Sequence, residues 1–201
     1  MKKKINFILT ATLIVVLMLQ PIGLSANSVN PRLSNGLKWY DTPRNIFFYC
    51  DFDTAEREAV RNAMNTWNAV RTPDNGYMVS MFLTTGEANN SVVKVPSYNA
   101  WIGYFEKVSI GDELLSVTIE LDSQRNWSTT GAADAYDVQT VVLHELGHAL
   151  GVAHCHEASE GAGPCWSATC LTNVMNPSGA KGRINTTLKD YDTASYILVY
   201  W

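Results

Sequence analysis

Residues 144–154, His-Glu-Leu-Gly-His-Ala-Leu-Gly-Val-Ala-His, contain three histidines at spacings suited to one metal ion. On a helix, a separation of four residues places His144 and His148 on one face, one turn apart, where both imidazoles can bind the same ion. Gly151 can adopt a left-handed backbone that ends the helix, so that the chain turns and His154 supplies a third ligand. Three protein ligands leave one coordination position for water, which is typical of catalytic rather than structural zinc.

Glu145 directly follows the first histidine and would lie beside the ion without binding it, which is the position of a general base. A bare His-x-x-x-His pair can also arise by chance on any helix. The added glycine and third histidine argue against chance here, and all four histidines of the chain lie between positions 144 and 156. The pattern therefore favours a metal-dependent hydrolase.

The stretch resembles the extended zinc signature of metzincin metallopeptidases, and Asn173–Pro177, Asn-Val-Met-Asn-Pro, resembles their Met-turn. The order of the other segments is similar to that of matrixin catalytic domains. Lys38-Trp39 precedes an apolar run at 46–49, a helix ends near Asn68, and a last helix is expected from Thr187 to Trp201. The resemblance implies an α+β domain with a twisted mixed β-sheet, a first helix, a zinc-binding active-site helix, a Met-turn and a C-terminal helix.

The resemblance also implies roles for individual residues. The expected ligands of one catalytic zinc ion are His144, His148 and His154. Glu145 would be the general base, Met175 the hydrophobic floor beneath the metal, and Pro177 part of the wall of the pocket beyond the scissile bond. Matrixins carry a second, structural zinc held by upstream histidines, which this chain lacks, so we expect a single zinc ion. The sequence does not reveal whether calcium binds.

The first 26 residues have the features of a secretory signal peptide. A basic start at Lys2–Lys4 precedes an apolar segment at 5–19 and a small-residue cleavage site at Leu24-Ser25-Ala26. The apolar segment is shorter than the ~20 residues that span a bilayer, which disfavours the alternative of an uncleaved membrane anchor. We therefore expect a secreted, extracellular protein with a short flexible lead at 27–36 and a catalytic domain at 37–201. The lead is too short for a typical inhibitory prodomain.

Composition constrains the partners. Without residues 1–26 the chain has 12 basic and 19 acidic side chains, a net charge of −7. An acidic protein of this kind is a poor ligand for nucleic acid or for an anionic membrane surface. We expect a monomer that binds a protein or peptide substrate and has no integral membrane association after signal cleavage.

Periodicity and capping residues predict the elements around the site. Ile46–Cys50 has the length and composition of a buried strand, and Val117–Leu121 alternates as a strand should. Asp53 and Asp137 are the expected caps of the first helix and of the active-site helix. Thr187 and Asp190 are the candidate caps of the last helix. Its expected core-facing side chains are Leu188, Tyr191, Ala194, Leu198 and Trp201. An extended substrate would pair with an edge strand, for which the candidate is the stretch 100–107.

The four cysteines, Cys50, Cys155, Cys165 and Cys170, are expected to form two disulfides, because exported proteins with an even cysteine count usually do. All three pairings remain possible. The alternative is a second, cysteine-bound metal, because His154-Cys155 also resembles the start of the cysteine-rich signature of archaemetzincins. The rest of that signature is missing.

The function expected from these observations is that of a secreted zinc metalloendopeptidase. One alternative is a secreted module that uses zinc only for folding, but such a site does not need a carboxylate beside an open position. Another is a zinc hydrolase of a non-protein substrate, because the spacing indicates metal-assisted hydrolysis and only the resemblance selects peptide.

Overall fold

The computed structural model describes residues 36–76, 78–97, 99–155 and 168–201. In chain order the elements are β1 Arg44–Cys50, α1 Thr54–Asn68, β2 Val79–Thr84, β3 Asn90–Val95, β4 Gly103–Ile110, β5 Glu113–Asp122, β6 Trp127–Ser128, β7 Tyr136–Asp137, α2 Val138–Ala149, α3 Ala168–Leu171 and α4 Asp190–Tyr200. The predicted signal peptide and all of the predicted lead except Gly36 lie outside the described residues, as do His156 and Cys165.

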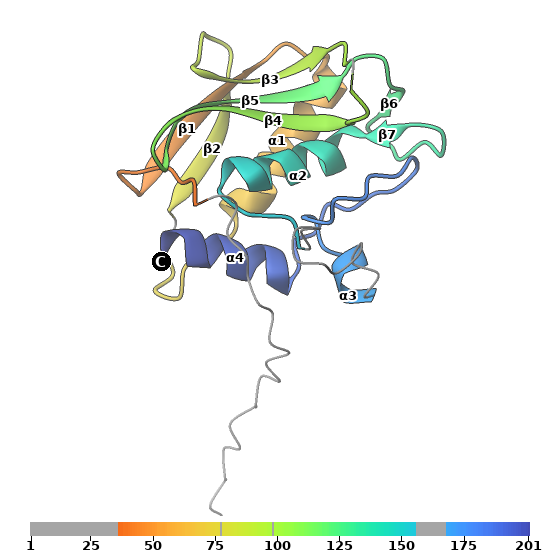
Figure 1. The fold of residues 1–201 in the computed structure, drawn as a ribbon. Coiled ribbons are helices and arrows are strands. Elements are labelled where there is room, and N and C mark those ends of the chain that lie inside the picture. Colours follow the sequence, from red (N-terminus) through yellow and green to blue (C-terminus); the bar gives the residue numbers. More distant parts are fainter. Residues whose placement is uncertain (1–35, 77, 98, 156–167) are drawn as a thin grey trace, which may run out of the picture.

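A five-stranded mixed sheet forms the upper layer of the fold (Figure 1). Its strand order is β2-β1-β3-β5-β4, with β4 antiparallel to β5 and the other neighbours parallel. The predicted strands 46–50 and 117–121 are confirmed as β1 and β5. The stretch proposed as an edge overlaps β4, which is indeed an edge strand of the sheet. The fold is the predicted α+β arrangement.

Helices α1 and α2 lie beneath the sheet and pack against each other in the core (Figure 1). Both begin where their caps were predicted. The Asp53 carboxylate accepts the Glu56 N–H at 2.9 Å, and the Asp137 carboxylate accepts the Thr140 N–H at 2.8 Å. Each bond satisfies a donor that the first helical turn leaves unpaired. The buried Trp67 indole donates to the Leu143 carbonyl at 2.9 Å, which fixes α1 against α2.

Helix α4 lies on the side of α2 away from the sheet, and here the predictions were wrong in two respects (Figure 1). The N-cap is Lys189 and the helix begins at Asp190, so neither Thr187 nor Asp190 caps it, whereas Tyr191 is buried as predicted. Its buried residues are Tyr191, Asp192, Ser195 and Tyr196, whereas the predicted core residues Leu198 and Trp201 are 55% and 68% exposed. The buried face differs from the prediction because it includes Asp192, whose carboxylate accepts hydrogen bonds from backbone N–H groups outside the helix. A hydropathy pattern does not predict such contacts.

One of the predicted disulfides is present, between Cys155 and Cys170. A second bridge through Cys50 was the wrong expectation, because Cys50 is a free thiol at the end of β1, fully buried among core side chains. Within the described ranges, no helix combines the length and apolarity that a membrane crossing requires.

Candidate metal centre

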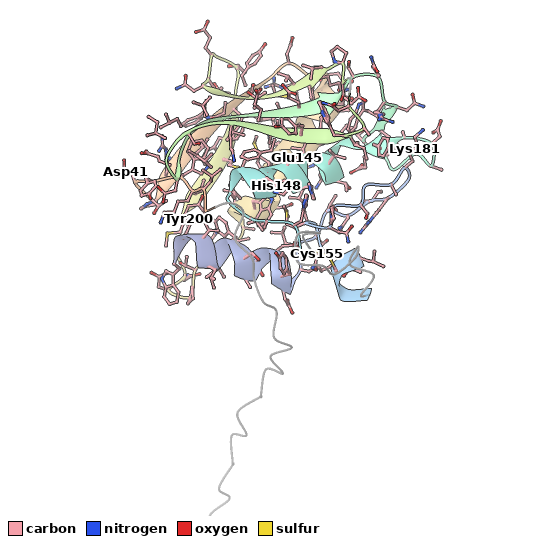
Figure 2. The ribbon with its side chains drawn as sticks, in the orientation of Figure 1. Asp41, Glu145, His148, Cys155, Lys181 and Tyr200 are labelled. Atoms are coloured by element: carbon pink, nitrogen blue, oxygen red, sulfur yellow. A yellow bond between two sulfur atoms is a disulfide. The ribbon has the colours of Figure 1, made fainter. Side chains whose placement is uncertain are left out.

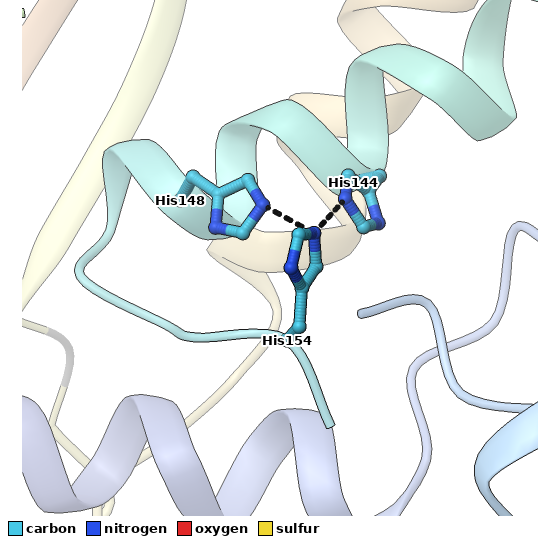
Figure 3. Close-up of side chains that lie close together, drawn as sticks. All are labelled: His144, His148 and His154. Carbon is cyan, nitrogen blue, oxygen red and sulfur yellow. Dashed lines mark hydrogen bonds between the residues drawn. The ribbon is translucent and has the colours of Figure 1, made fainter. Parts of the chain in front are cut away.

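Helix α2 presents the first two histidines and then ends sharply. Gly151 has the left-handed backbone predicted for it, with φ +81°, and a Cβ at this position would lie 2.4 Å from the Leu37 carbonyl oxygen. Only glycine combines that conformation with so close an approach. The chain then reverses below the helix, and His154 returns to face His144 and His148 (Figure 3).

The three imidazoles converge through their Nε2 atoms. The His154 Nε2 atom lies 3.1 Å from that of His144 and 3.0 Å from that of His148. The Nδ1 atoms of His144 and His148 lie 2.8 and 2.9 Å from the carbonyl oxygens of Val174 and Val152. When these Nδ1 atoms donate, both Nε2 atoms are acceptors, and one N–H on His154 can satisfy only one of them. A cation between the rings satisfies all three, and tetrahedral zinc with ~2.05 Å bonds separates its ligands by only ~3.3 Å. The donor set therefore fits zinc.

The protonation state of the histidines also suits a metal. Burial lowers the pKa of His144 to about 4, and the neighbouring His154 adds to the effect. Burial likewise lowers the pKa of His148 well below its usual value, and the neighbouring His144 and His154 lower it further. Neutral imidazole is the form that binds metal ions, so at neutral pH these ligands need release no proton.

Glu145 lies on the same helix, close to His148 (Figure 2), and lines the same pocket as the three histidines. Glu145 is buried, with 7% of the residue exposed, and burial raises its pKa to about 8. Gly103, the first residue of β4, leaves room for the Glu145 carboxylate because it has no side chain. A Cβ on Gly103 would lie 2.8 Å from Glu145 Oε1 and 2.6 Å from Val141 Cγ1. Sequence analysis missed Gly103 because the contact joins residues far apart in the chain.

The stretch predicted as the Met-turn, Asn173–Pro177, packs against α2. Met175 is fully buried, and a Cβ on Gly147, the residue before His148, would lie 2.3 Å from its sulfur. The Met175 carbonyl accepts the Cys155 N–H at 2.9 Å, which ties the turn to the segment that carries His154. The Tyr191 hydroxyl donates to the His154 carbonyl at 2.9 Å, so α4 also contacts that segment.

A pocket of about 300 Å³ opens beside the histidines and Glu145. The start of β4 contributes to the lining, as do residues of the Met-turn, including Pro177, and of the chain that follows the turn. The lining residues are Ala100–Gly103, Tyr136, Asp137, Thr140, Val141, His144, Glu145, His148, His154, Asn173, Val174, Asn176–Ala180, Arg183 and Asn185. The pocket thus joins the predicted metal ligands, the predicted base and the predicted wall residue in one cleft.

The chain matches one family model and a group of solved structures, one of which is described below. The family model described as Matrixin matches residues 106–169, which include all the predicted zinc ligands. Among solved structures, the fold is similar to the "Structure of myroilysin", with a TM-score of 0.51 and 16% sequence identity over 84% of this chain and 97% of that chain. At that identity the likeness concerns the fold alone. No curated protein sequence is significantly similar to the chain.

Proposed function

We propose that this chain, a matrixin-like metallopeptidase in its motif and its fold, is a secreted zinc endopeptidase with Glu145 as general base. One observation carries the proposal. Three half-buried histidines converge through their imidazole nitrogens beside a buried carboxylate, at a pocket of about 300 Å³. A zinc site needed only for folding is usually closed by four protein ligands and has no use for a carboxylate beside it.

In this mechanism His144, His148 and His154 hold the zinc ion. When bound, zinc supplies Lewis-acid polarisation of the scissile carbonyl and acidifies the attacking water. Glu145 accepts a proton from that water as it attacks the peptide carbon, and then delivers the proton to the departing amine. Burial raises the pKa of Glu145 to about 8, and a divalent cation nearby opposes that rise by favouring the ionised carboxylate.

The edge strand β4 is suited to bind an extended peptide. The Ile102 carbonyl accepts the Asp122 N–H at 3.0 Å, so the backbone groups of Ile102 point towards β5. In an antiparallel pair the next residue points its backbone groups the opposite way, and hence those of Gly103 and Phe105 face away from β5. A substrate strand that pairs with them passes beside Glu145, which Gly103 contacts.

The test compares the zinc-loaded wild-type protein with Glu145→Ala on a broad peptide mixture, with zinc content measured on the same samples. We expect equal zinc content and loss of hydrolysis only in the variant, because Glu145 moves protons without binding the metal. Glu58→Ala is the matched control, because Glu58 is exposed on α1, where it pairs with Arg61 and with no other residue that the structure describes. This control should retain full turnover.

Other outcomes identify the competing functions. If wild-type protein binds zinc but cleaves no peptide, the zinc serves folding or the substrate is not a protein, and hydrolysis of simple esters separates these two cases. Secretion is supported by residues 1–26 and by the Cys155–Cys170 bridge, which is typical of oxidising compartments. N-terminal sequencing of protein from the medium tests it, with a start at Asn27 expected.

A further inference from the structure

Helix α4 contains a buried carboxylate that the proposed mechanism does not use. Asp192 is fully buried. Its Oδ2 atom accepts the N–H groups of Lys189 at 2.8 Å and Val174 at 3.0 Å, and its Oδ1 atom accepts the N–H of Met175 at 3.1 Å. Burial raises the pKa of Asp192, and the three N–H donors oppose that rise. Because all three partners donate, the ionised carboxylate is the form that satisfies them.

One of these hydrogen bonds, from the Met175 N–H, leads to a metal ligand through a single peptide group. The Met175 N–H, which donates to Asp192, and the Val174 C=O, which lies 2.8 Å from His144 Nδ1, belong to the same Val174–Met175 peptide. In a trans peptide the N–H and the C=O point in opposite directions, so the carboxylate and the imidazole lie at its two ends. A negative charge at the N–H end increases the electron density on the carbonyl oxygen, because hydrogen bonds in a chain polarise one another.

We propose that Asp192 acts on His144 through the Val174–Met175 peptide, as a positioning residue for the zinc site. The strengthened carbonyl holds the proton on His144 Nδ1, keeps the ring in its metal-facing orientation and increases the electron donation of Nε2. Carboxylates that contact a metal-bound histidine directly have this effect. Here a peptide group transmits it from a helix that contributes no ligand. The inference rests on the zinc site of the proposed function.

His148 provides an internal reference. Its Nδ1 atom lies 2.9 Å from the Val152 carbonyl, nearly the same distance as in the His144 pair, but Asp192 does not bond to that part of the chain. The two histidines therefore differ in whether a carboxylate bonds to the peptide group whose carbonyl contacts their Nδ1 atom. In the zinc-loaded wild-type protein, the Nδ1 proton of His144 should resonate downfield of that of His148 in an NMR spectrum.

Asp192→Asn removes the charge while keeping the volume of the side chain. We expect zinc to bind roughly 10- to 100-fold more weakly in competition with a chelator. In the zinc-saturated variant the Nδ1 proton of His144 should move upfield, while that of His148 stays in place. Ser195→Ala is the control in the same helix, because Ser195 is buried one turn further on and its hydroxyl has no hydrogen-bond partner in the described part of the chain. It should leave zinc affinity and both resonances unchanged.

The outcomes separate this inference from the proposed function. If wild-type protein does not bind zinc, the proposed function fails. If it binds zinc but Asp192→Asn leaves affinity and the His144 resonance unchanged, only the inference fails. Equal shifts of His144 and His148 would indicate general loosening and would also overturn it. Should Asp192→Asn not fold, the wild-type spectrum decides, because a His144 proton at or upfield of that of His148 contradicts the proposal.

Discussion

Glu145→Gln should make the metal-free protein more stable while it abolishes catalysis. Burial raises the pKa of Glu145 from 4.5 to about 8. At pH 7 this carboxyl is ionised in the unfolded chain and protonated in the folded chain. The solution pH is then 2.5 units above the unfolded pKa of 4.5. One pH unit corresponds to ~1.4 kcal/mol, so the shifted pKa of Glu145 lowers the free energy of unfolding by about 3 kcal/mol at pH 7 and by about 5 kcal/mol above pH 8. Glutamine does not ionise and therefore removes this loss of stability.

The pH dependence gives the sign of the effect. A carboxyl whose folded pKa is raised stabilises the fold fully only below its unfolded pKa, and the stability is lost as the pH rises to 8. Urea unfolding of chelator-treated protein at pH 4, 7 and 8.5 should therefore show no advantage of the variant at pH 4 and an increasing advantage above it. Glu58→Gln is the exposed control. A gain of the same size at every pH, or a loss at pH 8.5, would refute the reasoning.

Three further predictions concern neighbouring features. Gly103→Ala should lower turnover severalfold with zinc content unchanged, because the new Cβ would lie 2.8 Å from Glu145 Oε1, whereas Gly86→Ala meets nothing closer than 3.8 Å and should retain turnover in the same peptide assay. Peptide mapping should find Cys50 as a thiol that alkylates only after denaturation, because it is fully buried. In metal-free Glu145→Gln protein, urea unfolding should show stability falling by at least roughly 3 kcal/mol between pH 6.5 and 4. The pKa of His144 is lowered to about 4 and that of His148 is also lowered, so the unfolded chain takes up protons first.

Each of these predictions has a contradicting result. Full turnover in Gly103→Ala would mean that the close approach of β4 does not position the base. Rapid alkylation of Cys50 in the native protein would show that the end of β1 opens to solvent. Stability that does not change, or that rises, as the pH falls below 6.5 would mean that the ligand histidines are not held neutral.

The sequence predicted elements whose signals are local. Asp53 and Asp137 each precede an apolar periodic segment, and each caps a helix through a bond three residues along the chain. Gly151 could be recognised because a left-handed turn leaves few alternatives to glycine. The convergence of the histidines followed from helical spacing, because residues four apart share a face.

The remaining features depend on contacts between distant segments. Asp192 reads as a solvent-facing charge in a helical pattern, yet it is buried by bonds to residues 17 and 18 positions earlier in the chain. The position of the buried face of α4 was therefore mispredicted. Gly103 carries no periodic signal, and its importance appears only when β4 approaches α2. The pairing of Cys155 with Cys170 likewise needed the fold, because cysteine spacing left three pairings open.

In the proposed function, three histidines hold one zinc ion with a coordination position open to water and substrate. X-ray absorption at the zinc edge of the purified, catalytically active protein tests it most directly. We predict one zinc per chain with three imidazole nitrogens and one oxygen at ~2.0–2.2 Å. A zinc–sulfur distance of ~2.3 Å, or a shell of four imidazoles, would contradict the claim, because either indicates a site closed by protein ligands.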